Sequence, residues 1–346
     1  MGDIVFRAPF CQENICIGAI SVESTSIHLD PNFFNQKKRK VMPEIDDFAK
    51  YLNFPQYPLN PLFDQNQEII DALVLNLRDY YEKTGVFNGI VVALSGGIDS
   101  AFTAYIASKA INSGLVTAIL MPSRYSSEGS LNDSIQLCVN LGIKHIILPI
   151  KKAHLLLENQ FDTSYRNSQE LSTLDISRQN LQARLRGVFL MYYSNLFKYL
   201  VVSTGNKSEI ATGYCTLYGD TNGGKNVPGD LYKTQLYDVC HYINREQNII
   251  PQNIIDKPPS AELKPDQIDQ DNLPPYPILD EVLSLRIDEG YSPREIIKKG
   301  YNPELVRKIE HLYTNAEFKR AQLPQTIKVN KKTFGKGRKI PVLKKS

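Results

Sequence analysis

Short apolar runs alternate with longer helical stretches over most of this chain. Strands are predicted over residues 90–94, 115–121, 144–149 and 199–203. The apolar run at residues 90–94 predicts a strand buried on both faces, and so does the segment 199–203. Helices are expected between and around them, over residues 65–81, 101–110, 130–141 and 179–198. The alternation predicts an α/β fold with a doubly wound, mostly parallel sheet and helices on both faces.

The two ends of the chain depart from this pattern. Residues 2–9 and 14–20 alternate like two short strands, which predicts an N-terminal β-hairpin. A hairpin without a helix does not form a stable unit alone. We therefore divide the chain into a hairpin with its linker, residues 1–40, and a larger domain, residues 41–346. Further helices are expected over residues 231–237, 278–289, 293–299 and 303–319.

The first buried strand runs into a polar glycine turn that opens a helix. A strand, a glycine turn and a helix N-terminus together gather free backbone N–H groups and the positive end of the helix dipole, which suits a phosphate. Asp99 cannot bind phosphate favourably, so a bridging Mg²⁺ is its natural role. The alternative is an ordinary turn with a Ser or Asp helix cap. The candidate phosphate-binding residues are Ser95, Gly96, Gly97, Ile98, Asp99 and Ser100.

Other polar residues follow later strands of the predicted sheet. Thr204 and Glu209 come after the strand at residues 199–203, and Glu209 could reach a metal held by Asp99. Asn180 and Arg184 lie on the helix before that strand, where arginine suits carboxylate or phosphate, although exposed arginines are common on surfaces. The segments 212–229, which contains Asp220, and 258–276 are expected to be binding loops.

Composition argues against a membrane protein and against a disulfide-rich secreted protein. Hydrophobic residues make up 42% of the 346 residues and charged residues 22%, which is ordinary for a soluble globular protein. No apolar run approaches the roughly 20 residues of a membrane helix, and we expect no signal peptide. Five scattered cysteines form no Cys-x-x-Cys pair, which fits a reducing cytoplasm.

Charge is unevenly distributed along the chain. The net charge is +3, but residues 319–346 hold ten Lys or Arg and no Asp or Glu, so the rest of the chain carries −7. The acidic body argues against a broad nucleic-acid surface, and no membrane contact is expected. A basic tail over a polyphosphate ligand accounts for the asymmetry.

The motif Ser95-Gly96-Gly97-Ile98-Asp99-Ser100 resembles the pyrophosphate loop of ATP pyrophosphatases, enzymes with the adenine-nucleotide α-hydrolase-like fold. With residues 121–127, 180–187, 203–209 and 259–263, it resembles the synthetase portion of glutamine-dependent NAD synthetases. The resemblance covers about residue 60 to the end. The N-terminal hairpin resembles the last hairpin of a nitrilase-type amidase domain.

This resemblance implies a ligase reaction. The carboxylate of deamido-NAD attacks the α-phosphate of ATP, pyrophosphate leaves, and ammonia then displaces AMP from the acyl-adenylate to give NAD. Mg²⁺ on Asp99 and Glu209 would neutralise charge on the leaving pyrophosphate. We infer that Asp220 takes a proton from the incoming ammonium. The resemblance places ATP on the loop and on Thr204, Lys233 and Ser260. It places deamido-NAD on Asn180, Arg184, Glu209 and Lys319.

The nitrogen source is where the chain departs from the family pattern. Leu217 stands where ammonia-dependent enzymes carry a lysine, as in the glutamine-dependent type, yet almost all of the amidase domain is absent. We expect the chain to use free ammonia, to receive it from a separate amidase subunit, or to be a fragment. A homodimer or larger homo-oligomer is expected, because family members self-associate.

Two alternatives remain open from the sequence. The chain could be another adenylating enzyme with the same loop, such as a tRNA-modifying enzyme or the synthetase half of a GMP synthetase. It could instead be a non-catalytic partner of an amidase subunit. The presence of Ser95, Asp99, Ser100 and Glu209 argues against a non-catalytic copy.

Overall fold

The computed structural model describes Cys11 and residues 64–165, 174–264, 267–335, 337 and 341–342. Residues Gln65–Ser346 form one compact unit. The predicted N-terminal hairpin and the boundary between residues 40 and 41 lie outside the described residues. None of the described helices combines the length and apolar character needed to cross a membrane.

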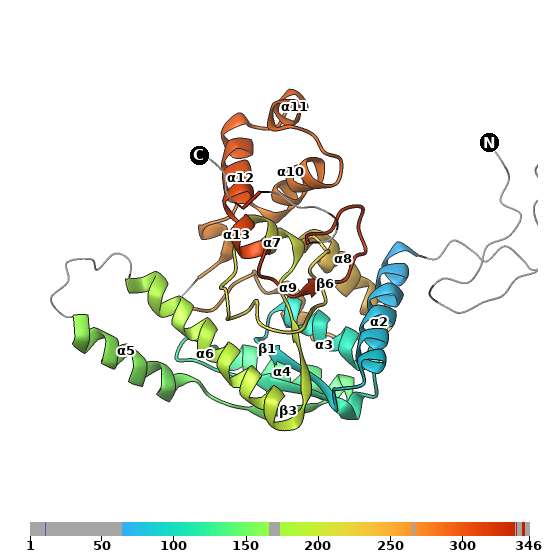
Figure 1. The fold of residues 1–346 in the computed structure, drawn as a ribbon. Helices are drawn as coiled ribbons and strands as arrows, with labels where there is room; N and C mark the ends of the chain where they lie inside the picture. Colours follow the sequence, from blue (N-terminus) through green and yellow to red (C-terminus); the bar gives the residue numbers. More distant parts are fainter. Residues whose placement is uncertain are drawn as a thin grey trace, which may run out of the picture. The chain divides into compact units, whose positions relative to one another are not determined.

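A six-stranded parallel sheet lies at the centre of this unit (Figure 1). Its strand order is β3-β2-β1-β4-β5-β6, and every neighbouring pair is parallel. The registers pair Ile90 with Val116 on one side of β1 and with Leu200 on the other. The strands are β1 (Gly89–Leu94), β2 (Val116–Leu120), β3 (Lys144–Ile147), β4 (Tyr199–Ser203), β5 (Lys225–Asn226) and β6 (Gln325–Thr326).

Helices cover both faces of the sheet, as the alternation predicts. On β1, Ile90 and Val92 pack into a core with α2, α3 and α8, whereas Val91 points to the opposite face and packs with Leu190 of α6. The helices that precede the C-terminal group are α2 (Gln65–Thr84), α3 (Ile98–Ala110), α4 (Glu128–Leu141), α5 (Lys151–Tyr165), α6 (Leu174–Phe197), α7 (Lys207–Thr212), α8 (Lys233–Ile243) and α9 (Gln252–Asp256).

A second hydrophobic core joins α7 to the C-terminal helices. Leu279, Val306 and Tyr313 are buried there with Phe334 from the tail. Figure 1 shows these helices gathered on one side of the sheet. They are α10 (Tyr276–Ile287), α11 (Pro293–Lys298), α12 (Pro303–Asn315) and α13 (Glu317–Arg320).

The expected α/β fold is confirmed, and several details differ from the sequence prediction. Helices α5 and α9 and the two-residue strands β5 and β6 were not expected. The expected helix over residues 303–319 ends at Asn315, and a short second helix begins at Glu317. Strands of two residues are too short to show a period, which explains why the pattern misses them.

Candidate active site

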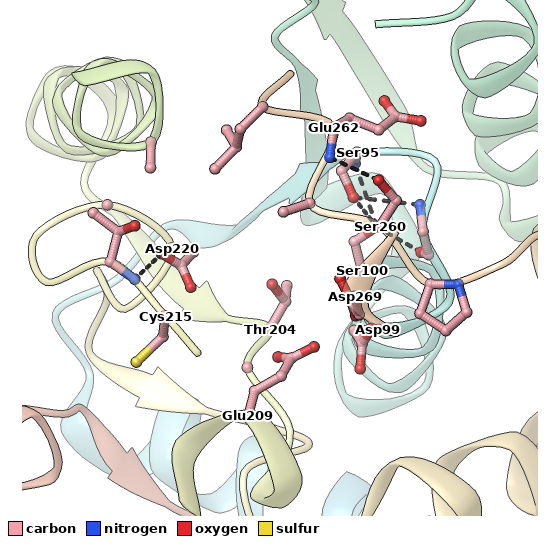
Figure 2. Close-up of a pocket in the computed structure, with 18 of the residues that line it drawn as sticks. Ser95, Asp99, Ser100, Thr204, Glu209, Cys215, Asp220, Ser260, Glu262 and Asp269 are labelled. Carbon is pink, nitrogen blue, oxygen red and sulfur yellow. Dashed lines mark hydrogen bonds between the residues drawn. The ribbon is translucent and has the colours of Figure 1, made fainter. Parts of the chain in front are cut away.

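The candidate site lies where the strand order reverses between β1 and β4. Loops leaving neighbouring parallel strands in opposite directions open a crevice at the carboxyl ends of the strands, which is where open α/β sheets bind ligands. Ser95 follows β1 and Thr204 follows β4. Both line a cavity of about 750 Å³. Figure 2 shows the loop after β1 on one side of it, Asp220 and Cys215 on the other, and Thr204 and Glu209 between them.

The turn after β1 is stabilised by hydrogen bonds of its own hydroxyl groups. Ser100 Oγ donates to Gly97 O at 2.9 Å, and Gly97 N–H donates to Ser95 Oγ at 3.3 Å. The helix cap of α3 is Gly97, with no side-chain hydrogen bond, so the alternative of a Ser or Asp cap is wrong. The first N–H groups of α3 therefore lack a side-chain acceptor, and the positive end of the helix remains available to an anion.

Gly96 is required by the shape of this turn. Its φ is +82°, and a Cβ there would lie 2.6 Å from the Cβ of Ser130 on α4. Glycine alone satisfies both constraints.

Two carboxylates and one lysine meet at the centre of the cavity. Lys233 Nζ at the start of α8 contacts Asp99 Oδ2 and lies 3.6 Å from Glu209 Oε1. Burial opposes the charge on Lys233, but Asp99 and Glu209 outweigh it and raise the pKa of the ammonium. Burial, with a smaller contribution from Asp99, also raises the pKa of Glu209.

Asn206 orients both carboxylates. Its Nδ2 donates to Asp99 Oδ1 at 2.7 Å, and its side chain and N–H form a capping box with Glu209 at the start of α7. The Asn206 side chain is completely buried. Each carboxylate thus keeps one oxygen on Asn206 and presents the other to a cation.

This arrangement fits a magnesium ion held mostly by phosphate. The two carboxylate oxygens that Asn206 does not bind already converge on one cation, the Lys233 ammonium. Carboxylate oxygens are ligands that Mg²⁺ prefers. Among the described residues, no group of three or more His, Cys, Asp or Glu side chains could hold a metal. Phosphate oxygens and water would have to complete the coordination.

The opposite wall of the cavity carries Asp220. Its Oδ1 accepts from Thr216 N–H at 2.7 Å, and Thr216 Oγ1 donates to Asn180 Oδ1 at 2.9 Å. Desolvation raises the pKa of Asp220 to about 6. Lys319 Nζ donates to the carbonyls of Gly213 and Cys215 at 2.8 and 2.7 Å, which fixes a positive charge beside this loop.

A strap of residues 257–264 is hydrogen-bonded to α4 through Ser130. Ser130 Oγ donates to Glu262 Oε1 at 2.8 Å, and Lys257 Nζ contacts both groups. Glu262 N–H donates to Ser260 Oγ at 3.1 Å, and Glu262 adopts a φ of +47°. Gln182 Nε2 of α6 donates to Leu263 O at 2.9 Å, so the strap spans from α4 to α6.

The structure brings most of the predicted site residues to one cavity. Gly96 is turned into α4 instead, and Arg184 is exposed and donates to Leu217 O at 3.2 Å. Arg184 misses the cavity because Asn180, Ala183, Arg186 and Leu190 form the inward stripe of α6. The predicted residues that line the cavity are Ser95, Gly97, Ile98, Asp99, Ser100, Asn180, Thr204, Glu209, Asp220, Lys233, Ser260 and Lys319.

Three residues of the site were not predicted from the sequence. The spacing of Asn206 and Glu209 is a capping-box signal, but nothing in it reveals the contact with Asp99, 107 residues earlier. Lys257 shows its role only through Ser130 and Glu262. Asp269 lines the cavity at 3% exposure and accepts from Tyr276 at 2.8 Å, and burial raises its pKa.

Comparison with known proteins places the chain in a family. The NAD synthase family model matches residues 69–323. Over 341 residues the chain is 38% identical to a glutamine-dependent NAD(+) synthetase of Synechocystis sp., covering 99% of this chain and 56% of the relative. Over 287 residues it is 44% identical to that of Thermotoga maritima, covering 82% and 49%. The chain spans about half the length of these curated relatives.

Solved structures give the same result. Glutamine-dependent NAD⁺ synthetase from Acinetobacter baumannii, in complex with ADP, is 36% identical with a TM-score of 0.55, over 83% of this chain and 51% of that one. An NH₃-dependent NAD synthetase from Campylobacter jejuni is 28% identical with a TM-score of 0.59, over 76% and 99%. The parallel sheet, the glycine turn after β1 and the matched residues 69–323 agree: the chain belongs to the NAD synthase family.

Proposed function

We propose that this chain catalyses the ATP-dependent amidation of deamido-NAD to NAD through an acyl-adenylate, with release of AMP and pyrophosphate. The observation that carries the proposal is the pairing of an uncapped helix N-terminus with a carboxylate pair in one cavity. That pairing suits a polyphosphate and its cation. The A. baumannii relative was solved with ADP, which supports ATP as the nucleotide.

In this proposal the ATP phosphates lie on the turn from Ser95 to Ser100. Ser260 and Thr204 donate hydrogen bonds to ATP from the strap and from the end of β4. Asp99 and Glu209 would hold Mg²⁺, which lowers the charge on the leaving pyrophosphate when bound. Lys233 supplies a further positive charge to the phosphates.

Deamido-NAD lies against the opposite wall. Asn180, Glu209 and Lys319 are the proposed contacts, and all three line the cavity. Because Arg184 is exposed outside the cavity, we do not place it on this ligand in a single chain.

Asp220 is the proposed acceptor of the ammonium proton. With a pKa of about 6 it is ionised at neutral pH and basic enough to take a proton. The ammonia so formed attacks the acyl carbon, the bond to the AMP oxygen breaks, AMP leaves with that electron pair, and the amide nitrogen releases its extra proton to water.

We propose ammonia, free or delivered by an amidase, as the nitrogen donor of this part of the chain. The similarity to the C. jejuni NH₃-dependent enzyme over 99% of its length supports it. The test is NAD formation by the purified chain with deamido-NAD, ATP and Mg²⁺, comparing ammonium with glutamine. We expect product with ammonium. If pyrophosphate is released but no NAD forms, only the adenylation step of the proposal is supported. If neither product forms, the proposal is overturned.

We further propose that the chain forms a homodimer through α5 and α6. These helices lie side by side (Figure 1) and carry large exposed apolar side chains. Val188, Tyr192 and Leu196, at 60–71% exposure, recur every four residues on α6, and Leu156 and Phe161 are exposed on α5. Light scattering should give a dimer mass, and Tyr192→Lys with Leu196→Lys should give a monomer. A wild-type monomer would refute this.

We also propose a cytoplasmic location. The thiols of Cys138, Cys215 and Cys240 are free, which fits a reducing compartment. Fractionation of cells carrying the tagged protein tests this, and recovery outside the cytosol would contradict it.

A further inference from the structure

Lys233 occupies the point at which the two carboxylates of the site meet. Its Nζ contacts Asp99 Oδ2 and lies 3.6 Å from Glu209 Oε1. The second oxygen of each carboxylate is held by Asn206, through Nδ2 for Asp99 and through N–H for Glu209 at 3.3 Å. Of the two carboxylates, the two oxygens that Asn206 does not bind are therefore the ones that face Lys233.

The backbone around Lys233 is fixed, so only its side chain can leave this position. Lys233 N–H donates to Ser208 Oγ at 3.0 Å, and Thr234 N–H donates to Asp280 Oδ2 at 2.8 Å. These bonds anchor the first turn of α8 to α7 and α10. Rotation about the four-carbon stem remains the way to move Nζ.

We propose that the Lys233 ammonium is an internal substitute for the divalent cation, holding the Asp99–Glu209 position in the nucleotide-free protein and moving to the phosphates when metal and nucleotide enter. This inference rests on the proposed function, because it assumes a metal–polyphosphate ligand. An ammonium and a divalent cation on the same two oxygens repel each other strongly in a cavity. Ser95, Gly97 and Ser100 of the turn after β1 line the same cavity, and phosphates bound there would offer Nζ a new anionic partner.

The consequence is cooperative binding of cation and polyphosphate. A cation alone must displace Lys233 from Asp99 and Glu209, which leaves its charge only the smaller attraction of Asp269. When the phosphates are present, the displaced Nζ pairs with them, so each ligand favours the other. The same residue also offsets part of the charge of two half-buried carboxylates between turnovers, since an unpaired charge away from water is unfavourable.

The experiment measures Mn²⁺ binding to the nucleotide-free protein by electron paramagnetic resonance of free Mn²⁺. We expect weak binding to the wild type and at least tenfold tighter binding to Lys233→Met. With α,β-methylene-ATP, which cannot be cleaved between the α and β phosphates, the advantage of the variant should disappear. Lys319→Met is the matched control, because Lys319 lines the same cavity but bonds two carbonyls. Its Mn²⁺ affinity should change less than twofold.

Two results would overturn the inference. In one, Lys233→Met binds Mn²⁺ as weakly as the wild type; in the other, both lysine variants gain equally, which indicates net charge alone. If the Met variant does not fold, Lys233→Gln replaces it with the same criteria. NAD formation is not part of this readout. A chain that makes no NAD but shows the gain refutes the proposed function and keeps this inference.

Discussion

At the scale of single residues, two carboxylates of the candidate site differ in their surroundings. Asp99 faces a lysine and an amide, whereas Asp220 faces a backbone N–H on the opposite wall. Environments of this kind assign different roles to chemically identical groups. The proposed division of labour between cation holding and proton transfer follows from that difference.

Asp220 should give the pH–rate profile of the reaction an acidic limb, that is, a fall in rate at low pH. Because desolvation raises its pKa to about 6, the carboxylate is protonated below that pH and can no longer accept a proton. We expect kcat/KM for ammonium to fall as pH drops through about 6. Asp220→Asn should remove this limb and lower kcat about 100-fold. A variant that keeps the same limb would show that another group titrates.

Asn206 should contribute separately to stability and to catalysis. Asn206→Ala removes the cap of α7 and the bond to Asp99, so it should destabilise the fold by about 1 kcal/mol and lower kcat at least tenfold. Asn206→Ser keeps a capping oxygen but does not reach Asp99. Urea unfolding of Asn206→Ser should match the wild type while its kcat stays low. Recovery of kcat by serine would contradict the positioning role.

At the scale of elements, the strand–turn–helix from β1 to α3 depends on one glycine. Gly96→Ala would combine a φ of +82° with a Cβ 2.6 Å from Ser130. We expect a loss of about 2–4 kcal/mol in unfolding free energy. ATP affinity, measured by calorimetry, should fall at least tenfold.

Gly335→Ala is the matched control for this change. Gly335 has a φ of +84°, but a Cβ at this position would meet nothing within 4 Å, so the variant carries the backbone strain without the collision. It should lose only about 1–2 kcal/mol and keep its ATP affinity. Equal losses in the two variants would mean that Ser130 moves aside at little cost.

The elements also show how far sequence reasoning reaches. Residues 90–94 are a continuous apolar run and residues 199–203 are apolar up to Ser203, and both form strands within one residue of the expected bounds. The turn at Ser95 was found because its chemistry is local. Asn206, Lys257 and Asp269 were missed because their roles depend on partners far along the chain, such as Asp99 and Ser130. Arg184 lies outside the cavity because one step along a helix turns a side chain by about 100°.

At the scale of the whole molecule, a buried charge network joins the sheet layer to the C-terminal helices. Lys207 of α7 is fully buried and lies 3.0 Å from Asp230 and 3.2 Å from Asp288. It also donates to Lys332 O at 2.7 Å. The residue next to Asn206 thus ties the active site to the tail.

Lys207→Met should destabilise the whole unit. Removing the cation leaves two buried carboxylates unpaired, which costs about 3–5 kcal/mol. Urea unfolding should show a lower midpoint for fluorescence and circular dichroism alike. Adding Asp288→Asn should restore part of the loss. A change seen by one probe alone would mean that the network stabilises the C-terminal helices only.

The strand order also bears on how the chain is made. Strands β1, β2 and β3 can pair once residue 147 has emerged from the ribosome, but the other side of β1 must wait for Tyr199 to Ser203. Roughly fifty residues separate the two events, which is several seconds of synthesis. During that interval a half-built sheet exposes the hydrogen-bonding edge of β1, one of its two central strands. The chain therefore passes through an open-edged intermediate before the site of the proposed nucleotide is complete.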